Sequence, residues 1–180
     1  MIARCLFGCV LLLPQLLCGQ NNTWTTLSYP QAGCAWQMPS APSYLDSLGV
    51  RMYSLELDTA VGITVHFVLD MAPDITADGP FMAAFDVEGD TLRAMAQLML
   101  LTSGAELVAI SDTLLGAVAV LDMVTSTPLD LDGNATISRL RLVYDHKRFM
   151  SFLVLGPSTR SSEIQSYAAG MNSSLNITTW

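Results

Sequence analysis

The sequence predicts an α+β domain in which an antiparallel β-sheet carries one long helix and a C-terminal helix packed on it. Three observations lead to this fold class. Short runs of alternating apolar and polar residues recur along the chain, which is typical of half-buried antiparallel strands. One mid-chain segment spaces its apolar residues as a helix does, and a short amphipathic segment lies near the end. Strand runs broken by only two helices favour α+β over alternating α/β.

The leader, residues 1–20, is predicted to be a signal peptide. Arg4 precedes an apolar run over residues 6–17, which is too short to cross a bilayer, and small residues follow it. We expect cleavage near the end of this leader, which leaves residues 21–180 as one domain. The expected location is secreted, periplasmic or cell envelope, with no stable membrane span once the leader is removed. An uncleaved anchoring helix is the less favoured alternative.

Cysteine usage and charge limit the function further. Only Cys34 of the four cysteines clearly remains in the mature chain, so stability must come from core packing rather than from disulfides. Cys18 could carry a lipid anchor, but the residues before it match a lipid-attachment sequence poorly, so this is less favoured. The net charge of −8 disfavours nucleic acid and anionic membranes as partners.

The first half of the domain is predicted to contain two strand pairs. Alternation and turn signals give the strands Asn21–Pro30, Gly33–Met38, Val50–Asp58 and Val61–Leu69. The two prolines of "PSAPSYLDSLG" predict a loop between the pairs, and "DTA" predicts a tight hairpin turn. A polar loop, "DMAPDITADGP", follows the second pair.

A helix and four strands form the second half. Leu92, Met95, Ala96 and Met99 recur at helical spacing, with Asp90 as a cap and Gly104 just past the end, so a helix is expected over Asp90–Ser103. The strands are predicted at Glu106–Ser111, Gly116–Thr125, Ala135–Tyr144 and Arg148–Leu155. The motifs "DLDGN" and "DH" predict tight turns. The run "GAVAVL" is apolar on both faces, which favours a central strand covered on both sides.

The last segment predicts a helix that packs back on the sheet. It has one apolar stripe: Ile164, Tyr167, Ala168, Met171 and Leu175. Ser161 or Ser162 is the expected N-cap, and Glu163 stands in the first turn, where the helix dipole favours a carboxylate.

This order of elements resembles the PsbP-like fold, which the photosystem II extrinsic subunit shares with a small Ran-binding import factor and DcrB-type bacterial envelope proteins. The stretches that carry the resemblance are "CAWQMPSAP", "DTLLGAVAVLDM", "ISRLRLVYDHKRFMSFLVLG" and "SSEIQSYAAGMNSSL". The chain departs from such proteins at its end, "GMNSSLNITTW". The resemblance implies an α/β/α sandwich and an exported setting. It implies no reaction, because the group has no common activity.

The sequence offers no catalytic motif. Neither His66 nor His146 stands at a zinc-binding spacing, and there is no nucleophile elbow and no phosphate loop. Cys34 lies in a strand-like stretch and is expected to be a buried structural thiol. No catalytic, cofactor-binding or metal-binding residue is therefore assigned. A small secreted hydrolase using Cys34 and a histidine stays open as an alternative.

Two aspartate-rich loops raise the possibility of calcium binding. Their candidate ligands are Asp130, Asp132 and Asn134 in one loop, and Asp70, Asp74 and Asp78 in the other. The first set fails the EF-hand pattern because Arg141 stands where a bidentate glutamate is needed. A hairpin turn explains this set without a metal, and a calcium-dependent binding module stays the second alternative.

The remaining features concern stacking and glycosylation. Any of Trp24, Trp36 and Trp180 could stack on a sugar or peptide, but Trp36 is expected in the core and Trp180 is expected to be mobile or packed against a neighbour. Asn-x-Ser/Thr sequons stand at Asn21, Asn134, Asn172 and Asn176. Asp-Ser/Thr-aliphatic triplets, which resemble a bacterial O-glycosylation motif, are centred on Ser47, Thr59, Thr91 and Thr113. Either set could make the protein a glycoprotein, and chance also accounts for both.

Taken together, these features predict an exported, non-enzymatic binding or support protein. Its expected partner is an unidentified envelope or secreted protein, which would contact one sheet face or one sheet edge. No cofactor is expected.

Overall fold

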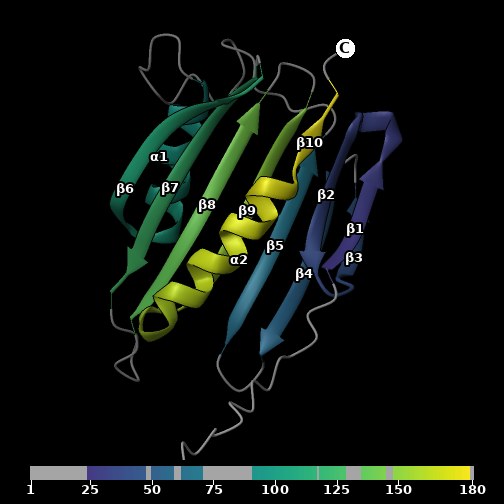
Figure 1. Cartoon of the computed structure of the whole chain (residues 1–180). Helices are drawn as coiled ribbons and strands as arrows, with labels where there is room; N and C mark the ends of the chain where they lie inside the picture. Colours follow the sequence, from purple (N-terminus) through teal and green to yellow (C-terminus); the bar gives the residue numbers. More distant parts are fainter. Residues whose placement is uncertain are drawn as a thin grey trace, which may run out of the picture.

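The computed structural model describes residues 24–47, 50–58, 62–70, 91–116, 118–128, 135–144 and 148–178 (Figure 1). Its strands are β1 (Trp24–Tyr29), β2 (Cys34–Pro39), β3 (Ser43–Ser47), β4 (Val50–Asp58), β5 (Ile63–Asp70), β6 (Glu106–Leu115), β7 (Val118–Thr127), β8 (Thr136–Tyr144), β9 (Phe149–Pro157) and β10 (Asn176–Ile177). The helices are α1 (Thr91–Ser103) and α2 (Ser161–Ser174), with short 3-10 turns at Pro30–Ala32 and Ser158–Arg160.

The strands form two antiparallel sheets. The large sheet has the order β3-β4-β5-β9-β8-β7-β6, and the small sheet has the order β1-β2-β10. Every neighbouring pair runs antiparallel. In the small sheet β2 is central, so the first and last described strands of the chain lie on either side of it.

Helix α2 and the small sheet lie side by side on one face of the large sheet, which we call the front face (Figure 1). The larger core cluster fills the space between them. Trp36 of β2 is fully buried, with its ring centroid 3.9 Å from that of Phe67 on β5. Ile164 and Met171 of α2 are fully buried in the same cluster. The predicted docking of the closing helix is confirmed.

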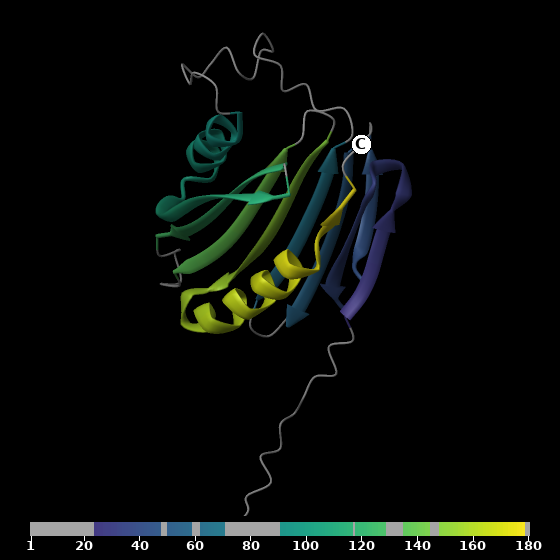
Figure 2. The same cartoon turned by 45° about the horizontal axis from the view of Figure 1, so that its top comes forward.

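Helix α1 lies on the opposite face, which we call the rear face (Figure 2). Leu92 and Ala96 of the helix pack with Leu121, Leu142 and Phe149 of the sheet in a second, smaller cluster. The helix covers β7 and β8 and leaves the rear of β4 and β5 outside this cluster. Two helical layers around an antiparallel sheet confirm the predicted α+β class and the α/β/α arrangement.

Two short strands lie where the sequence predicted none. β3 falls inside the proline-punctuated stretch predicted as a loop, and it pairs with β4 in register Tyr44 with Tyr53. β10 falls in the polar C-terminal stretch and pairs with β2, while Ile177 packs on the front core. Both strands depend on a partner already in place, because their own sequences bury little apolar surface.

Three further predictions about the elements are corrected. β6 continues to Leu115 instead of ending at Ser111, and β7, which carries "GAVAVL", is next to the sheet edge instead of central. β7 is apolar on both faces because α1 covers its rear and the front core its other side. Neither Ser161 nor Ser162 caps α2: Arg160 is the N-cap residue and makes no side-chain capping bond.

Other local predictions hold. Gly104 follows α1 with a φ of 66°, and its N–H donates to the Leu100 carbonyl. This left-handed conformation favours glycine and ends the helix as predicted. Glu163 stands in the first turn of α2 and pairs with the Arg160 guanidinium. The leader, Asp90 and the turns at "DTA", "DLDGN" and "DH" lie at least partly outside the described residues.

Candidate functional site

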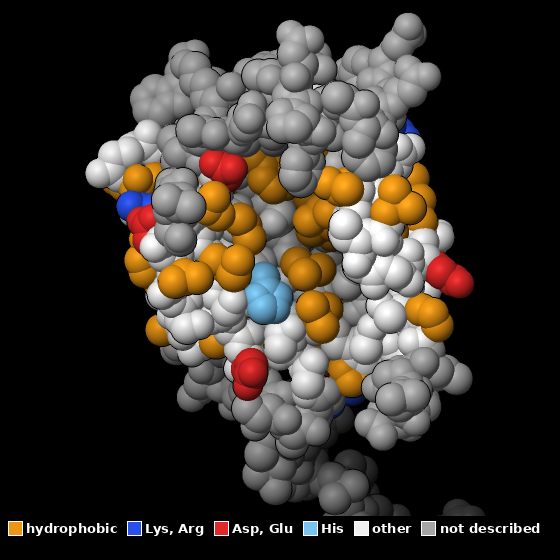
Figure 3. Space-filling view, turned by 180° about the vertical axis from the view of Figure 1, so that it is seen from behind, with side chains coloured by type: hydrophobic (Ala, Val, Ile, Leu, Met, Phe, Trp, Pro, Cys, Tyr) orange, Lys and Arg blue, Asp and Glu red, His pale blue; other side chains and the backbone are white. Residues whose placement is uncertain are grey.

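A groove with a volume of about 530 Å³ runs along the rear face between α1 and the strands beside it (Figure 3). We call it the rear groove. Its lining residues are Met52, His66, Val68, Met99, Leu100, Thr102, Ser103, Ala105, Met123, Thr125, Thr127, Thr136, Ser138, Leu140, Ser151, Leu153 and Leu155. They come from α1, the segment just after it, and five strands of the large sheet, so strand pairing and helix docking together make the groove.

The lining is apolar with a few hydroxyl groups. No aspartate, glutamate, lysine or arginine is among the lining residues. Three methionines contribute flexible, polarisable walls, which adapt well to the shape of an apolar partner. Hydroxyl groups on the floor pair with one another across strands, as Thr125 Oγ1 and Ser138 Oγ do at 2.6 Å. The groove therefore suits an uncharged, apolar occupant.

His66 is the one ordinarily titratable side chain in this lining. The alternation of β5 places it on the rear face, and the β4–β5 register sets it opposite Ser54. Ser54 Oγ and His66 Nδ1 lie 2.8 Å apart. Burial lowers the pKa of His66 below its usual value, which favours the neutral imidazole near pH 7. A neutral ring adds no charge to the groove.

The Ser54–His66 contact has the distance of a nucleophile–base pair but lacks the third member of a hydrolase triad. A triad needs a carboxylate or amide that orients the histidine. No such group lines the groove. Because the two residues are direct cross-strand neighbours, register alone explains why their side chains meet.

The described residues do not bring Cys34 and His66 together. Cys34 is 4% exposed and belongs to the front core, whereas the His66 side chain lies on the rear face of the sheet. The expected structural thiol is confirmed as buried, and no disulfide forms within the described chain. His146, the other histidine considered for a hydrolase, lies outside the described residues.

The calcium hypothesis involves residues that are mostly outside the described ranges. Asp70 ends β5, and the other candidate ligands, Asp74, Asp78, Asp130, Asp132 and Asn134, are not described. Within the described ranges, no group of three or more His, Cys, Asp or Glu side chains could hold a metal ion.

The tryptophans and sequons divide in a similar way. Trp36 is in the core, as expected, and Trp24 is 36% exposed on β1, while Trp180 lies outside the described residues. Asn172 lies on α2 and Asn176 is exposed on β10. Glycosylation at these sequons stays a prediction.

The rear groove continues into an exposed apolar patch toward the β3 edge. The β3–β4 register pairs Leu45 with Met52, so both side chains share the rear face. Leu45 is 60% exposed and Met52 is 39% exposed. We call these two residues the edge patch. Sequence analysis considered His66 for zinc-binding spacing and did not predict a groove on its strand face. The signal was present in Met52 and Val68, apolar residues on that same face.

Comparison with known proteins identifies the fold. No family model matches the chain, and no curated protein matches it in sequence. The solution structure of cyanobacterial PsbP (CyanoP) from Synechocystis sp. PCC 6803 is similar, with a TM-score of 0.55 and 13% identity over 92% of this chain and 99% of that one. PA94 from Pseudomonas aeruginosa gives a TM-score of 0.48 at 11% identity, covering 87% of this chain and 99% of that one. LpqN of Mycobacterium tuberculosis, involved in cell envelope biogenesis, gives 0.48 at 13% identity, covering 87% and 91%.

The similarity to CyanoP confirms a PsbP-like fold and agrees with the resemblance seen in the sequence. At this low identity the match carries the arrangement of strands and helices, not an activity. Neither described helix is long and apolar enough to cross a membrane.

Proposed function

We propose that this chain is an exported, non-enzymatic binding protein whose rear groove and edge patch dock apolar side chains of a protein partner. The observation that carries the proposal is the uncharged lining of the rear groove, which opens toward the exposed Leu45 and Met52. A contiguous exposed apolar surface of this kind is typical of an interaction site.

The edge patch favours a protein over an enclosed small molecule. A pocket for a small apolar ligand buries most of that ligand inside its walls. Here the apolar surface extends past the groove onto an edge strand, where a larger partner could cover it. The three methionines and the uncharged lining also match protein interfaces, whose cores are depleted of charged residues and enriched in methionine.

The exported setting rests on the leader. Its single arginine, short apolar run and small residues support cleavage and release into a secreted, periplasmic or envelope compartment. Intact-mass measurement of the protein from that compartment tests this step. A mass that corresponds to a chain starting near residue 20 supports leader cleavage. A full-length mass in the membrane fraction, or the added mass of a lipid on Cys18, contradicts it.

Site-specific photocrosslinking in the native cells tests the docking surface. A photoreactive phenylalanine at Met52 should give a discrete adduct with one protein, and the same group at Ser28, exposed on β1, should not. Leu45→Asp should weaken that adduct about tenfold, because a carboxylate would have to be desolvated at the interface. Leu45 is exposed, so this substitution should leave the fold intact.

Two results would contradict the proposal. One is an adduct whose added mass is that of a small lipid, which would assign the groove to a small molecule. The other is a protein adduct that Leu45→Asp leaves unchanged, which would separate the crosslink from the edge patch.

A further inference from the structure

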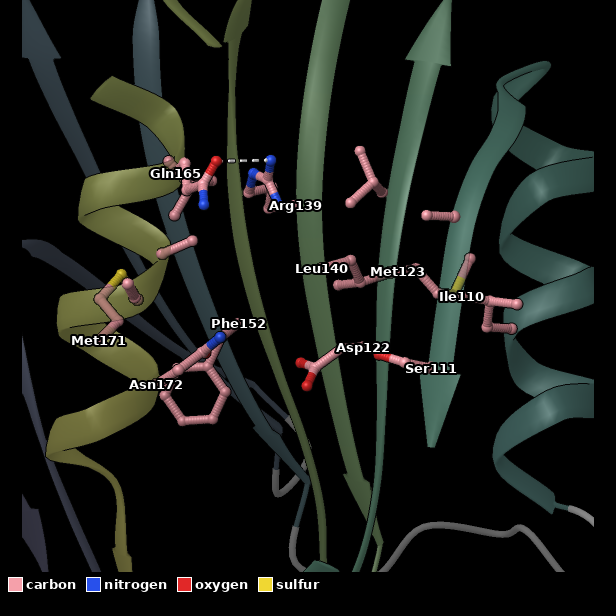
Figure 4. A pocket seen from close by; sticks show the side chains of 15 residues that line it. Ile110, Ser111, Asp122, Met123, Arg139, Leu140, Phe152, Gln165, Met171 and Asn172 are labelled. Atoms are coloured by element: carbon pink, nitrogen blue, oxygen red, sulfur yellow. Dashed lines mark hydrogen bonds between the residues drawn. The ribbon is translucent and has the colours of Figure 1, made fainter. Parts of the chain in front are cut away.

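A second hollow lies on the front face, between α2 and β6, with β7 and β8 as its floor (Figure 4). We call it the front groove, and its volume is about 300 Å³. The α2 residues that line it include Gln165, Ala169 and Asn172, which recur at helical spacing and so form one wall. From Gln165 to Asn172 this wall is about 10 Å long, at the rise of an α-helix.

The hydrogen bonds of the Arg139 guanidinium are incomplete in this groove. Its NH2 group donates to Gln165 Oε1 at 3.1 Å, and its Nε is buried without a hydrogen-bond partner. No carboxylate in the described part of the chain forms an ion pair with it. A buried N–H without an acceptor is costly, so a ligand that supplies one would be favoured.

The neighbouring arginine shows the contrast. Arg141 forms a bidentate pair with Asp122, with nitrogen–oxygen distances of 2.7 Å and 2.8 Å, and also donates to the Asn172 carbonyl. Asp122 is thereby neutralised. The front groove is left with one positive charge, at Arg139, in a chain whose net charge is −8.

The rest of the lining is apolar or small. Ala168 and Ala169 on the helix leave space above the floor, and Phe152 and Met171 close the deep side. Figure 4 shows Arg139 and Gln165 together at one end of this space, with Asp122 toward the other. An occupant would place an anionic group at Arg139 and a short apolar body along the alanines.

We infer that the front groove binds a small monocarboxylate with a short apolar body. A planar guanidinium matches a carboxylate in shape and charge, and the ligand oxygens could accept from Arg139. A single negative charge balances the single free positive charge. A phosphate dianion would exceed that balance by one negative charge. This site is separate from the proposed function, because the sheet lies between the two grooves.

Hexanoate is a suitable probe. Titration into protein labelled with ¹⁵N at arginine should shift the Arg139 Nε–Hε signal in a saturable way at millimolar concentration. Hexanol should bind at least about tenfold more weakly than hexanoate, because it lacks the charge that pairs with Arg139. Hexyl phosphate, run in parallel, distinguishes a carboxylate from a phosphate ligand.

Two variants and one control sharpen the test. Arg139→Gln should lower hexanoate affinity about tenfold or more, whereas Arg160→Gln, which removes the same charge at the start of α2, should leave it unchanged. Ala169→Phe should also abolish binding, because the ring fills the groove from an exposed helix position. If Arg139→Gln fails to fold, Ala169→Phe with the Arg139 signal as readout decides alone.

Three outcomes would overturn the inference. The first is no saturable shift of the Arg139 signal at millimolar hexanoate. The second is hexanoate binding that neither Arg139→Gln nor Ala169→Phe weakens. The third is tighter binding of hexyl phosphate than of hexanoate, which would assign the site to a phosphate.

Discussion

At the scale of single residues, burial decides what Cys34 can do. The side chain is 4% exposed and packs in the front core. A thiol acts as a nucleophile only when it is ionised and accessible, and a buried thiol in apolar surroundings is inert. The position of Cys34 therefore supports a packing role.

We expect the native protein to react slowly with thiol reagents and the unfolded protein to react at once. Cys34→Ala should lower the free energy of unfolding by about 1 kcal/mol, as for a small buried side chain. Reaction rates with a chromogenic disulfide and urea denaturation measure the two effects. Rapid reaction of the native thiol at neutral pH would instead favour the hydrolase alternative.

His66 should make stability depend on pH. In the folded state, burial lowers the pKa of His66 below its usual value of 6.5. The unfolded state therefore binds a proton at a higher pH than the folded state does. The free energy of unfolding should then fall as pH drops from about 7 to about 5, and level off below the folded pKa. Glu56 of β4 and Asp70 of β5 are the carboxylates on the same face of the sheet.

The variant His66→Gln isolates this contribution. Its urea midpoint should decline less over the same pH range, because the substitution removes only the contribution of His66. Identical pH profiles would show that His66 is not the group responsible.

At Gly170 of α2, the space beside the backbone limits which side chain can be accommodated. A Cβ atom built there would lie 2.5 Å from Cη2 of Trp24, so the α2 backbone and the indole are in direct contact. Alanine in place of glycine should stabilise a helix by about 1 kcal/mol. At this site the indole must move first, which offsets that gain.

A double-mutant cycle tests this contact. Gly170→Ala should be neutral or destabilising in the wild-type chain and stabilising by about 1 kcal/mol once Trp24→Ala has removed the ring. Urea denaturation of the four proteins gives the coupling free energy. An additive cycle would mean that Trp24 does not pack on Gly170 in solution.

The sequence predicted some of these residue positions and could not predict others. Cys34 and Trp36 alternate with the less buried Ala35 and Gln37, so their burial followed from the strand pattern. The uncompensated charge at Arg139 is different, because it depends on Asp122 of β7 pairing with Arg141 of β8. A local sequence pattern does not indicate which arginine pairs with a given aspartate, so the sequence did not predict the front groove.

At the scale of elements, α2 shows how a short helix depends on the sheet beneath it. Ile164 is fully buried, and a Cβ built at Gly156 of β9 would lie 3.2 Å from its Cδ1 atom, so helix and strand are closely packed. A helix of this length is marginal alone in water, so packing must hold it.

Ile164→Ala should lower the free energy of unfolding by roughly 2–4 kcal/mol, since it leaves a cavity under α2. Ser162→Ala should have almost no effect, because no serine caps the helix. Urea denaturation measures both. In the unmodified protein, amide exchange over residues 164–169 should be as slow as over 118–121, and exchange at free-peptide rates would show that α2 is not docked.

Long, strongly patterned elements were predictable and partner-dependent ones were not. The two helices and most strands of the large sheet lie where apolar periodicity placed them. β3 was missed because "SYLDS" is short, flanked by loop signals and exposed at Tyr44 and Leu45. It is a strand because β4 offers it an unpaired edge, which is a property of another segment of the chain.

At the scale of the whole molecule, the C-terminal strand holds the small sheet to the rest. Arg148 is fully buried, and its guanidinium donates to the carbonyls of Ala32 and Thr178, the latter at 2.9 Å. One side chain next to the start of β9 thus joins the turn before β2 to the residue after β10. Leu175 and Ile177 add apolar contacts to the same core.

Deleting residues 175–180 should therefore weaken an element far away in sequence. We expect amide exchange in β2 to accelerate, because one strand edge, two apolar side chains and an acceptor for Arg148 are lost together. Hydrogen–deuterium exchange with mass spectrometry measures this. The amides of β7 serve as the internal control, and equal changes in β2 and β7 would indicate general destabilisation instead of a local effect.

The position of β2 between β1 and β10 also determines when, during synthesis, the small sheet can be completed. β2 is made well before β10, because 143 positions separate Cys34 from Ile177. At about 5–20 residues per second, a ribosome needs roughly 7 to 30 seconds to cover that distance. A two-stranded hairpin is marginal alone, so β2 lacks one of its two strand partners until β10 has been made. In a newly made molecule the small sheet therefore stays incomplete, and accessible to a chaperone, until β10 emerges.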